Sequence, residues 1–137
     1  MRHSAKSAPA AAARTIDKTG LILLEVAAWA VPGAAHLWLG RRQKGIAFVV
    51  MLPLMFLVGL GFHGRLFPFD VSEPLVALAS IADFGLGVPF LLARMVGAGG
   101  GEVTAITYEY GNAFLIVAGL LNFLIMLDAY DIALGRK

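Results

Sequence analysis

The chain is 137 residues long, and 59% of its residues are hydrophobic while only 15% are charged. Soluble domains are about 45–50% apolar, so this composition excludes an ordinary water-soluble domain, and the absence of cysteine excludes disulfides, thiolate metal sites and cysteine nucleophiles. The formal net charge of +2 is too small to indicate binding to nucleic acid.

Four apolar segments fill over half of the chain, at 21–39, 45–62, 73–93 and 111–130. A helix that crosses a bilayer needs roughly 20 mostly apolar residues, because each residue rises about 1.5 Å and the hydrocarbon layer is about 30 Å thick. All four segments come close to that length. The sequence therefore predicts an all-α, polytopic integral membrane protein with one helical domain, 21–137.

A basic arm, 1–20, precedes this domain. Its cations are diluted by alanines and opposed only by Asp17, and they are Arg2, Lys6, Arg14 and Lys18. Cations beside a membrane span favour the cytoplasmic side and anionic headgroups, each by about 1 kcal/mol. We expect the arm to be flexible and solvated, and to help orient the chain.

The first apolar segment, 21–39, is interrupted near its middle by Pro32 and Gly33. Proline removes a backbone donor and glycine relaxes the chain, so a kink or a break into two half-helices is expected there. The segment then either crosses as a kinked helix or re-enters the same side of the membrane. We expect Trp29 and Trp38 at interfacial depths.

The second segment, 45–62, is the cleanest predicted span, with Pro53 as its only helix breaker. The loop that follows holds aromatic residues typical of a membrane interface. Ser72 is expected to cap the next helix, with Glu73 and Pro74 in its first turn.

The third segment, 73–93, carries Asp83 near its middle, and two glycines and a proline loosen its second half. The glycine-rich run 97–101 predicts a flexible linker, because it lacks the residues of a phosphate-binding loop. The fourth segment, 111–130, is expected to begin with Asn112 as its cap.

Two topologies remain open. Four full spans place both termini in the cytoplasm but leave the basic turn formed by Arg41, Arg42 and Lys44 outside, whereas a re-entrant first segment puts the turn inside and the C-terminus outside. In either case three spans separate that turn from Asp128 and Asp131. We therefore expect the turn and these carboxylates on opposite sides, with no ion pair between them.

The basic turn ends the stretch 32–45, whose sequence is Pro-Gly-Ala-Ala-His-Leu-Trp-Leu-Gly-Arg-Arg-Gln-Lys-Gly. It resembles the pattern P-G-x-G-H-x-Y-L-G-R-x-x-x-G of the bacterial domain named for its two transmembrane helices, with Ala35 in place of a usual glycine and Trp38 in place of a usual tyrosine. The ending, 118–133, resembles a bacterial family of small membrane proteins of unknown function. These resemblances imply an uncharacterised membrane protein and no particular mechanism.

Four polar residues in the apolar segments are candidate functional residues, namely Asp83, Glu25, His36 and Asn122. A carboxylate at mid-span costs at least about 2.5 kcal/mol on insertion scales, so Asp83 is the strongest candidate, either for a structural hydrogen bond or for a proton, ion or substrate path. Glu25 lies nearer a helix end and is expected at the interface. Asn122 is expected to form an interhelical hydrogen bond.

The remaining polar residues favour structural roles. His36 and Arg41 can satisfy freed backbone carbonyls in a hairpin, and the turn Arg41, Arg42 and Lys44 can bind headgroup phosphate. His36 and His63 lack the spacing of a metal site, so we expect no metal, haem or other cofactor. A solvated helix end is expected at the C-terminus, with Asp128 and Asp131 offset by Arg136 and Lys137.

These patterns favour a non-enzymatic accessory or interaction subunit, a multi-pass protein of the bacterial plasma (inner) membrane. Its expected partners are the lipid bilayer and either another membrane protein or further copies of itself, and not nucleic acid. The alternative is a small transporter or proton-conducting oligomer, in which Asp83 lines a polar path with help from Glu25 or His36. An intramembrane enzyme is a third possibility, for which no catalytic constellation is recognisable.

Overall fold

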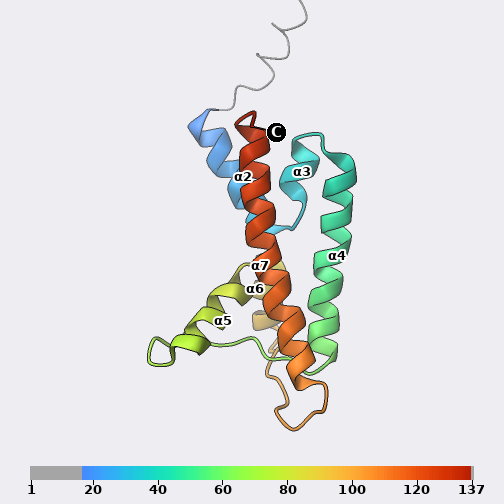
Figure 1. Cartoon of the computed structure of the whole chain (residues 1–137), viewed down its shortest axis with the longest axis vertical. Coiled ribbons are helices and arrows are strands. Elements are labelled where there is room, and N and C mark those ends of the chain that lie inside the picture. The colour runs from blue at the N-terminus through green and yellow to red at the C-terminus, as the bar shows by residue number, and fades with distance from the viewer. Residues whose placement is uncertain (1–16, 137) are drawn as a thin grey trace, which may run out of the picture.

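The computed structural model describes residues 17–136. Within that range the chain forms six helices: α2 (Lys18–Ala30), α3 (Ala34–Trp38), α4 (Arg42–Gly61), α5 (Pro74–Phe84), α6 (Val88–Met95) and α7 (Tyr108–Ala133). The predicted all-α class is confirmed (Figure 1). Most of the predicted basic arm, 1–16, lies outside the described residues, as does Lys137. Residues 18–20 of the arm are helical, because the Asp17 side chain accepts a hydrogen bond from the Gly20 amide and caps α2.

Helices α4 and α7 form the long axis of the molecule. They are 20 and 26 residues long, and both are apolar enough to cross a membrane. They run antiparallel, since Lys44 near the start of α4 contacts Asp128 near the end of α7, while Gly59 near the end of α4 packs against Leu115 near the start of α7. This pair is the frame on which the shorter helices are placed (Figure 1).

The first apolar segment folds back on itself. Helix α2 runs to the middle of the molecule, and α3 returns to the end at which α2 began (Figure 1). Gly33 makes the turn with φ +89°, and a Cβ atom there would lie 2.5 Å from the Gly45 carbonyl oxygen of α4. A single continuous helix over 21–39 is therefore wrong, and the fold-back has the shape of the re-entrant form that the sequence allows.

The third apolar segment is also broken. Helices α5 and α6 meet at 109° across a break at residues 85–87, where Gly87 has φ +74°. A continuous helix over 73–93 with Asp83 at its middle is therefore wrong, because α5 ends at Phe84, directly before Gly85. Two helices can cross a membrane, or three if this bent pair counts as one span. Four spans are not confirmed.

Two predicted helix starts differ from the structure. The Ser72 amide and hydroxyl donate to Asp70 instead of capping α5, which begins at Pro74 without a side-chain cap. These two hydrogen bonds hold the pKa of Asp70 below its usual range. Helix α7 begins at Tyr108, so Asn112 lies inside it, where its side-chain oxygen accepts a hydrogen bond from the Arg65 amide at 2.7 Å.

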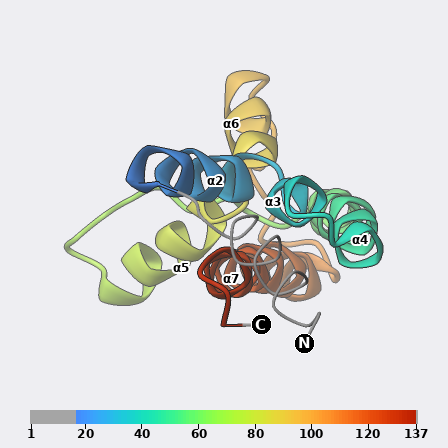
Figure 2. The same cartoon turned by 90° about the horizontal axis from the view of Figure 1, so that it is seen from above.

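The core lies along one face of α7. Viewed from above, α2, α3 and α4 form an arc on one side of α7, with α5 beside it (Figure 2). The buried residues of α7 recur every three or four positions, and they are Gly111, Leu115, Ala118, Gly119, Asn122, Ile125, Ala129, Ile132 and Ala133. Because many of them are small, the neighbouring backbones approach α7 closely.

The glycine-rich run 97–101 packs against the loop that follows α4. The Leu66 amide donates to the Gly99 carbonyl at 2.9 Å, and Arg65 forms a bridge with Gly100. The run is therefore held to the end of the bundle that holds the 62–73 loop, and it is more than a linker.

Candidate functional site

Asn122 occupies the point where both broken segments meet α7. Its side-chain amide donates to the Trp29 carbonyl at 3.1 Å and to the Gly85 carbonyl at 2.7 Å, and Asn122 is fully buried. Trp29 belongs to the last turn of α2, and Gly85 follows α5. Carbonyls at helix ends have no partner within their own helix, so one side chain satisfies two of them in the interior.

Trp29 joins the two broken segments directly. Its indole N–H donates to the Phe84 carbonyl at 2.8 Å, and the Trp29 and Phe84 rings lie 5.0 Å apart. The approach is close, because a Cβ atom on Gly87 would lie 1.9 Å from the Trp29 carbonyl oxygen. The break that follows α2 places Trp29 at the junction with α5, and its interfacial depth stays a prediction.

Asp83 lies at the end of α5 and is fully buried. Its Oδ2 atom accepts a hydrogen bond from the Phe67 amide at 3.0 Å, whereas its Oδ1 atom is buried without a partner among the described residues. The contact ties the loop after α4 to the helix that follows. One observed task of Asp83 is thus to hold the chain between α4 and α5.

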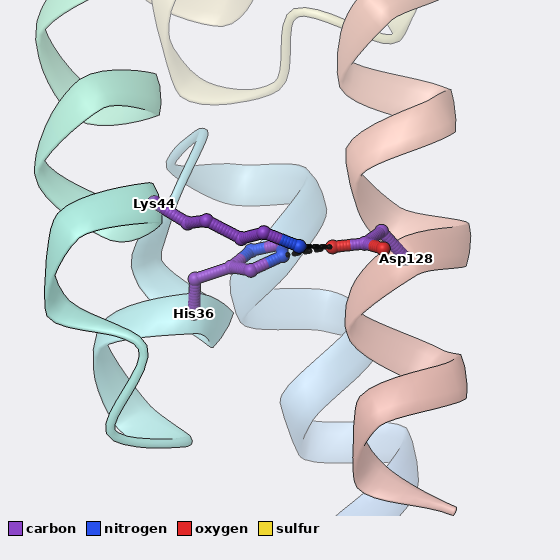
Figure 3. Close-up of polar contacts among 3 residues, drawn as sticks. All are labelled: His36, Lys44 and Asp128. Carbon is purple, nitrogen blue, oxygen red and sulfur yellow. Dashed lines mark hydrogen bonds and ion pairs between the residues drawn. The ribbon is translucent and has the colours of Figure 1, made fainter. Parts of the chain in front are cut away.

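A second polar cluster joins α3, α4 and α7. The side chains of His36 and Lys44 point at the carboxylate of Asp128 from two different helices (Figure 3). The His36 Nε2 atom lies 2.7 Å and the Lys44 Nζ atom 3.3 Å from the same Asp128 oxygen. His36 is fully buried, and the Asp128 side chain is 19% exposed, so the pair is shielded from bulk water. Shielding strengthens such a contact and makes its loss costly.

This cluster corrects two predictions. The sequence predicts the basic turn and Asp128 on opposite sides, yet Lys44 contacts Asp128, because the third segment folds back, so that α4 leads away from the turn and α7 returns to it. Asp128 was expected at a solvated helix end. That description fits Asp131, which pairs with Arg136 at 2.9 Å.

Asp128 is the residue that the sequence reasoning missed. It lies three residues after Ile125 and next to Ala129, both of which belong to the buried face of α7. Helical spacing from Asn122 would have placed Asp128 beside that face rather than in water. Arg41, the first residue of the basic turn, also packs locally: its amide donates to the His36 carbonyl at 2.8 Å and closes α3.

We expect the Asp128→Ala variant to be much less stable than Asp131→Ala. Removal of Asp128 leaves a buried imidazole without its partner, which costs about 1–3 kcal/mol. Asp131 and Arg136 form an exposed ion pair. The loss of this ion pair should change stability by no more than about 0.5 kcal/mol. The melting temperatures of both variants in the same detergent test this difference. Equal melting temperatures would show that the buried His36–Asp128 pair contributes no more to stability than the exposed Asp131–Arg136 pair.

Glu25 lines a largely apolar groove between α2, α5 and α7. The groove has a volume of about 510 Å³, and its lining residues are Leu21, Ile22, Glu25, Val26, Trp29, Phe84, Phe123, Met126 and Tyr130. The Oε1 atom of Glu25 is buried and has no hydrogen-bond partner within 17–136. A polar atom in such surroundings is costly unless a donor reaches it. Glu25 is therefore the position in this groove at which a ligand's hydrogen-bond donor would find an acceptor.

The predicted candidates do not share partners. Asp83 contacts the loop after α4, His36 contacts Asp128, and Glu25 faces the apolar groove. In the part of the chain that the structure describes, no three His, Asp or Glu side chains are placed to hold a metal ion together. Arg42 is exposed at the start of α4, in the basic turn beside the His36 cluster.

Comparison with known proteins places the chain in a family. No curated protein and no solved structure matches it significantly. The model of a family of unknown function, DUF6677, matches residues 23–137, from within α2 to the C-terminal end. The match contains most of the α2–α3 hairpin, the broken third segment and both polar clusters. The chain therefore belongs to the DUF6677 family of unknown function.

Proposed function

We propose that this protein crosses a bacterial plasma membrane with α4 and α7, while the α2–α3 and α5–α6 pairs enter the bilayer from opposite sides and return. The length and composition of α4 and α7 support this arrangement. So do the hydrogen bonds of Asn122 and Trp29, because non-helical backbone at membrane depth requires partners within the protein.

The charge distribution supports one orientation. Near one end of the bundle lie Lys18, Arg41, Arg42, Lys44 and Arg136. Toward the other end lie Arg65, in the loop after α4, and Arg94, in the last turn of α6. Cytoplasmic loops carry the excess of Lys and Arg. The end with the basic turn therefore faces the cytoplasm, and both ends of the described chain lie on that side.

The function that we infer is that of a non-enzymatic accessory subunit, which receives a transmembrane helix of another protein in the α2–α7 groove. The groove is the observation that carries this inference. Its wall includes Ile22 and Val26, which are 62% and 54% exposed, so it opens sideways toward the membrane. A lateral opening of this size suits a helix face.

Glu25 indicates which chemical group the partner helix should present to the groove. Its buried Oε1 atom lacks a donor, and an unsatisfied carboxyl oxygen is unfavourable in hydrocarbon. A helix with a hydrogen-bond donor, such as a lysine, a serine or a tryptophan indole, would satisfy it. Lipid chains alone supply no donor at that depth.

A photo-crosslinking amino acid at Val26 tests the docking surface in native membranes. Val50 on α4 is the matched control, because it is the same residue type and is 55% exposed against 54% for Val26. We expect one recurring protein adduct from Val26 that is absent from Val50. Glu25→Leu should abolish the adduct, and Glu25→Gln should retain it, since glutamine still accepts a hydrogen bond.

Other adducts would contradict the proposal. Crosslinks only to lipid would mean that the groove is part of the ordinary membrane surface. Crosslinks only to a second copy of the chain would indicate a homo-oligomer. Identical adducts from Val26 and Val50 would show that the groove has no preference for a partner.

Proton conduction through Asp83 is the rival function, and it gives a separate prediction. Asparagine at this position can still accept the hydrogen bond of the Phe67 amide, so the fold should persist. We expect any proton flux across proteoliposomes that contain the protein to be unchanged by Asp83→Asn. A flux that this substitution abolishes would favour the transporter.

A further inference from the structure

A second cavity lies at the end of the bundle opposite the basic turn. It has a volume of about 430 Å³ and is formed by the loop after α4 and the glycine-rich run after α6. Two arginines border the cavity: Arg65 belongs to the loop after α4, beside Leu66 and Pro68, and Arg94 lies in the last turn of α6, before the glycine-rich run. Two guanidinium groups therefore border one small space.

Neither arginine is neutralised by an acidic side chain. Among residues 17–136, no carboxylate lies within 4.0 Å of either guanidinium. Two acidic residues of the neighbouring loops have other partners, since Asp70 accepts from Ser72 and Glu102 lies 3.8 Å from His63. The charge of the two arginines is thus available to a ligand.

Both guanidinium groups are oriented by aromatic rings. Arg65 lies 5.5 Å from the centre of the Phe67 ring, and Arg94 lies 5.7 Å from the centre of the Phe90 ring. A cation–π contact of this kind holds a guanidinium close to the ring and uses none of its N–H groups as hydrogen-bond donors. A guanidinium so placed offers paired donors, which suit the oxygens of a phosphate.

An aromatic cavity adjoins the arginine cavity. It has a volume of about 300 Å³, and Phe67, Phe69, Phe84 and Phe90 contribute to its wall. Arg94 lines both cavities. A polar, cationic space and an apolar space therefore share one arginine, as a ligand with an anionic head and a hydrocarbon part requires.

We propose that the Arg65–Arg94 cavity binds the phosphate group of an amphiphile whose hydrocarbon part enters the neighbouring aromatic cavity. The site is distinct from the α2–α7 groove and does not depend on the partner proposed above. The same chemistry would also accept free phosphate. The binding experiment therefore includes both sources.

Binding to the purified full chain in dodecyl maltoside tests the proposal, with dihexanoyl phosphatidic acid, dihexanoylglycerol and inorganic phosphate as probes. We expect dihexanoyl phosphatidic acid to bind. Dihexanoylglycerol, which lacks the phosphate, should not bind. Arg65→Gln and Arg94→Gln should each weaken binding at least about tenfold, because each removes hydrogen bonds to a charged group. Arg42→Gln, at the opposite end, should bind like the natural protein.

The outcomes are distinguishable. Equal affinity for inorganic phosphate would support the site and assign it to free phosphate, whereas weaker binding of inorganic phosphate would assign it to a lipid headgroup. Equal binding of phosphatidic acid and dihexanoylglycerol, no binding of either phosphate probe, or unchanged affinity in the arginine variants would overturn the proposal. Where a glutamine variant does not fold, Arg65→Lys and Arg94→Lys replace it, and they should also weaken binding because lysine cannot bind a phosphate through a paired fork.

Discussion

The Gly87→Ala variant is expected to lose several kcal/mol of stability, far more than Gly97→Ala. Both glycines have a positive φ, +74° at Gly87 and +76° at Gly97, so alanine is strained at either site, by about 1–2 kcal/mol in the left-handed helical region. Gly87 also has ψ −131°, which lies outside that region, so its backbone is the less accessible to alanine. The two glycines also differ in what a side chain would meet. A Cβ atom on Gly87 would lie 1.9 Å from the Trp29 carbonyl oxygen, whereas at Gly97 nothing lies within 4 Å.

The difference between these variants reports the backbone conformation of Gly87 together with the contact between the two broken segments. Overpacking in a tightly packed interior adds about 1–3 kcal/mol at Gly87. Thermal unfolding of the natural protein and both variants in one detergent measures the effect. If Gly87→Ala and Gly97→Ala melt at the same temperature, the close approach of α2 to the break between α5 and α6 does not exist.

The Asn122→Leu variant is expected to show the second large effect. Leucine fills a similar volume but donates no hydrogen bond, so the Trp29 and Gly85 carbonyls lose their buried donor. Each unsatisfied carbonyl costs about 1–3 kcal/mol. The two broken segments should loosen together, because one side chain serves both.

Asn112→Leu is the matched control for Asn122. The side chain of Asn112 also lies on α7, but it accepts a single hydrogen bond from the Arg65 amide near the end of the bundle, where it is only half-buried. We expect the smaller loss of stability for Asn112→Leu, and faster hydrogen exchange around residues 85–90 only for Asn122→Leu. The reverse order of melting temperatures would show that the interior hydrogen bonds do not hold the broken segments.

The sequence predicts the parts of this fold that depend on local properties. Length and apolar content are sufficient for α4 and α7, and the adjacent Pro32 and Gly33 indicate the break of the first segment. The resemblance to a family of unknown function is confirmed by the family match. Each of these features depends on residues that are close together in the sequence.

The break of the third segment depends on residues that are distant in the chain. Gly85, Gly87 and Pro89 weaken that helix, but the carbonyls freed by the break are satisfied by Trp29 and Asn122, both more than 30 residues away. A continuous helix satisfies its own carbonyls. The local sequence therefore weakens the continuous helix but does not by itself select the broken form.

The buried face of α7 cannot be recognised in the sequence, for a different reason. Its lipid-facing and protein-facing sides are both apolar, so the sequence lacks the polar stripe that reveals the outer face of a soluble helix. Leu120, Leu124 and Leu127 are exposed, whereas Leu115 and Ile125 are buried. Asp128 was consequently assigned to solvent, and its contact with His36 was missed.

The central claim is that α4 and α7 cross the membrane while the other two apolar segments enter it and return. Labelling of single cysteines in sealed vesicles by a membrane-impermeant maleimide tests it most directly, because the natural chain contains no cysteine. Gln43→Cys, Leu134→Cys and Val71→Cys place the label at exposed positions in the basic turn, at the end of α7 and in the loop before α5. The fold predicts that positions 43 and 134 react from the same side of the membrane and position 71 from the other. Reaction of positions 71 and 134 from one side and of position 43 from the opposite side would mean that the segment 73–93 also crosses the membrane, and it would contradict the fold.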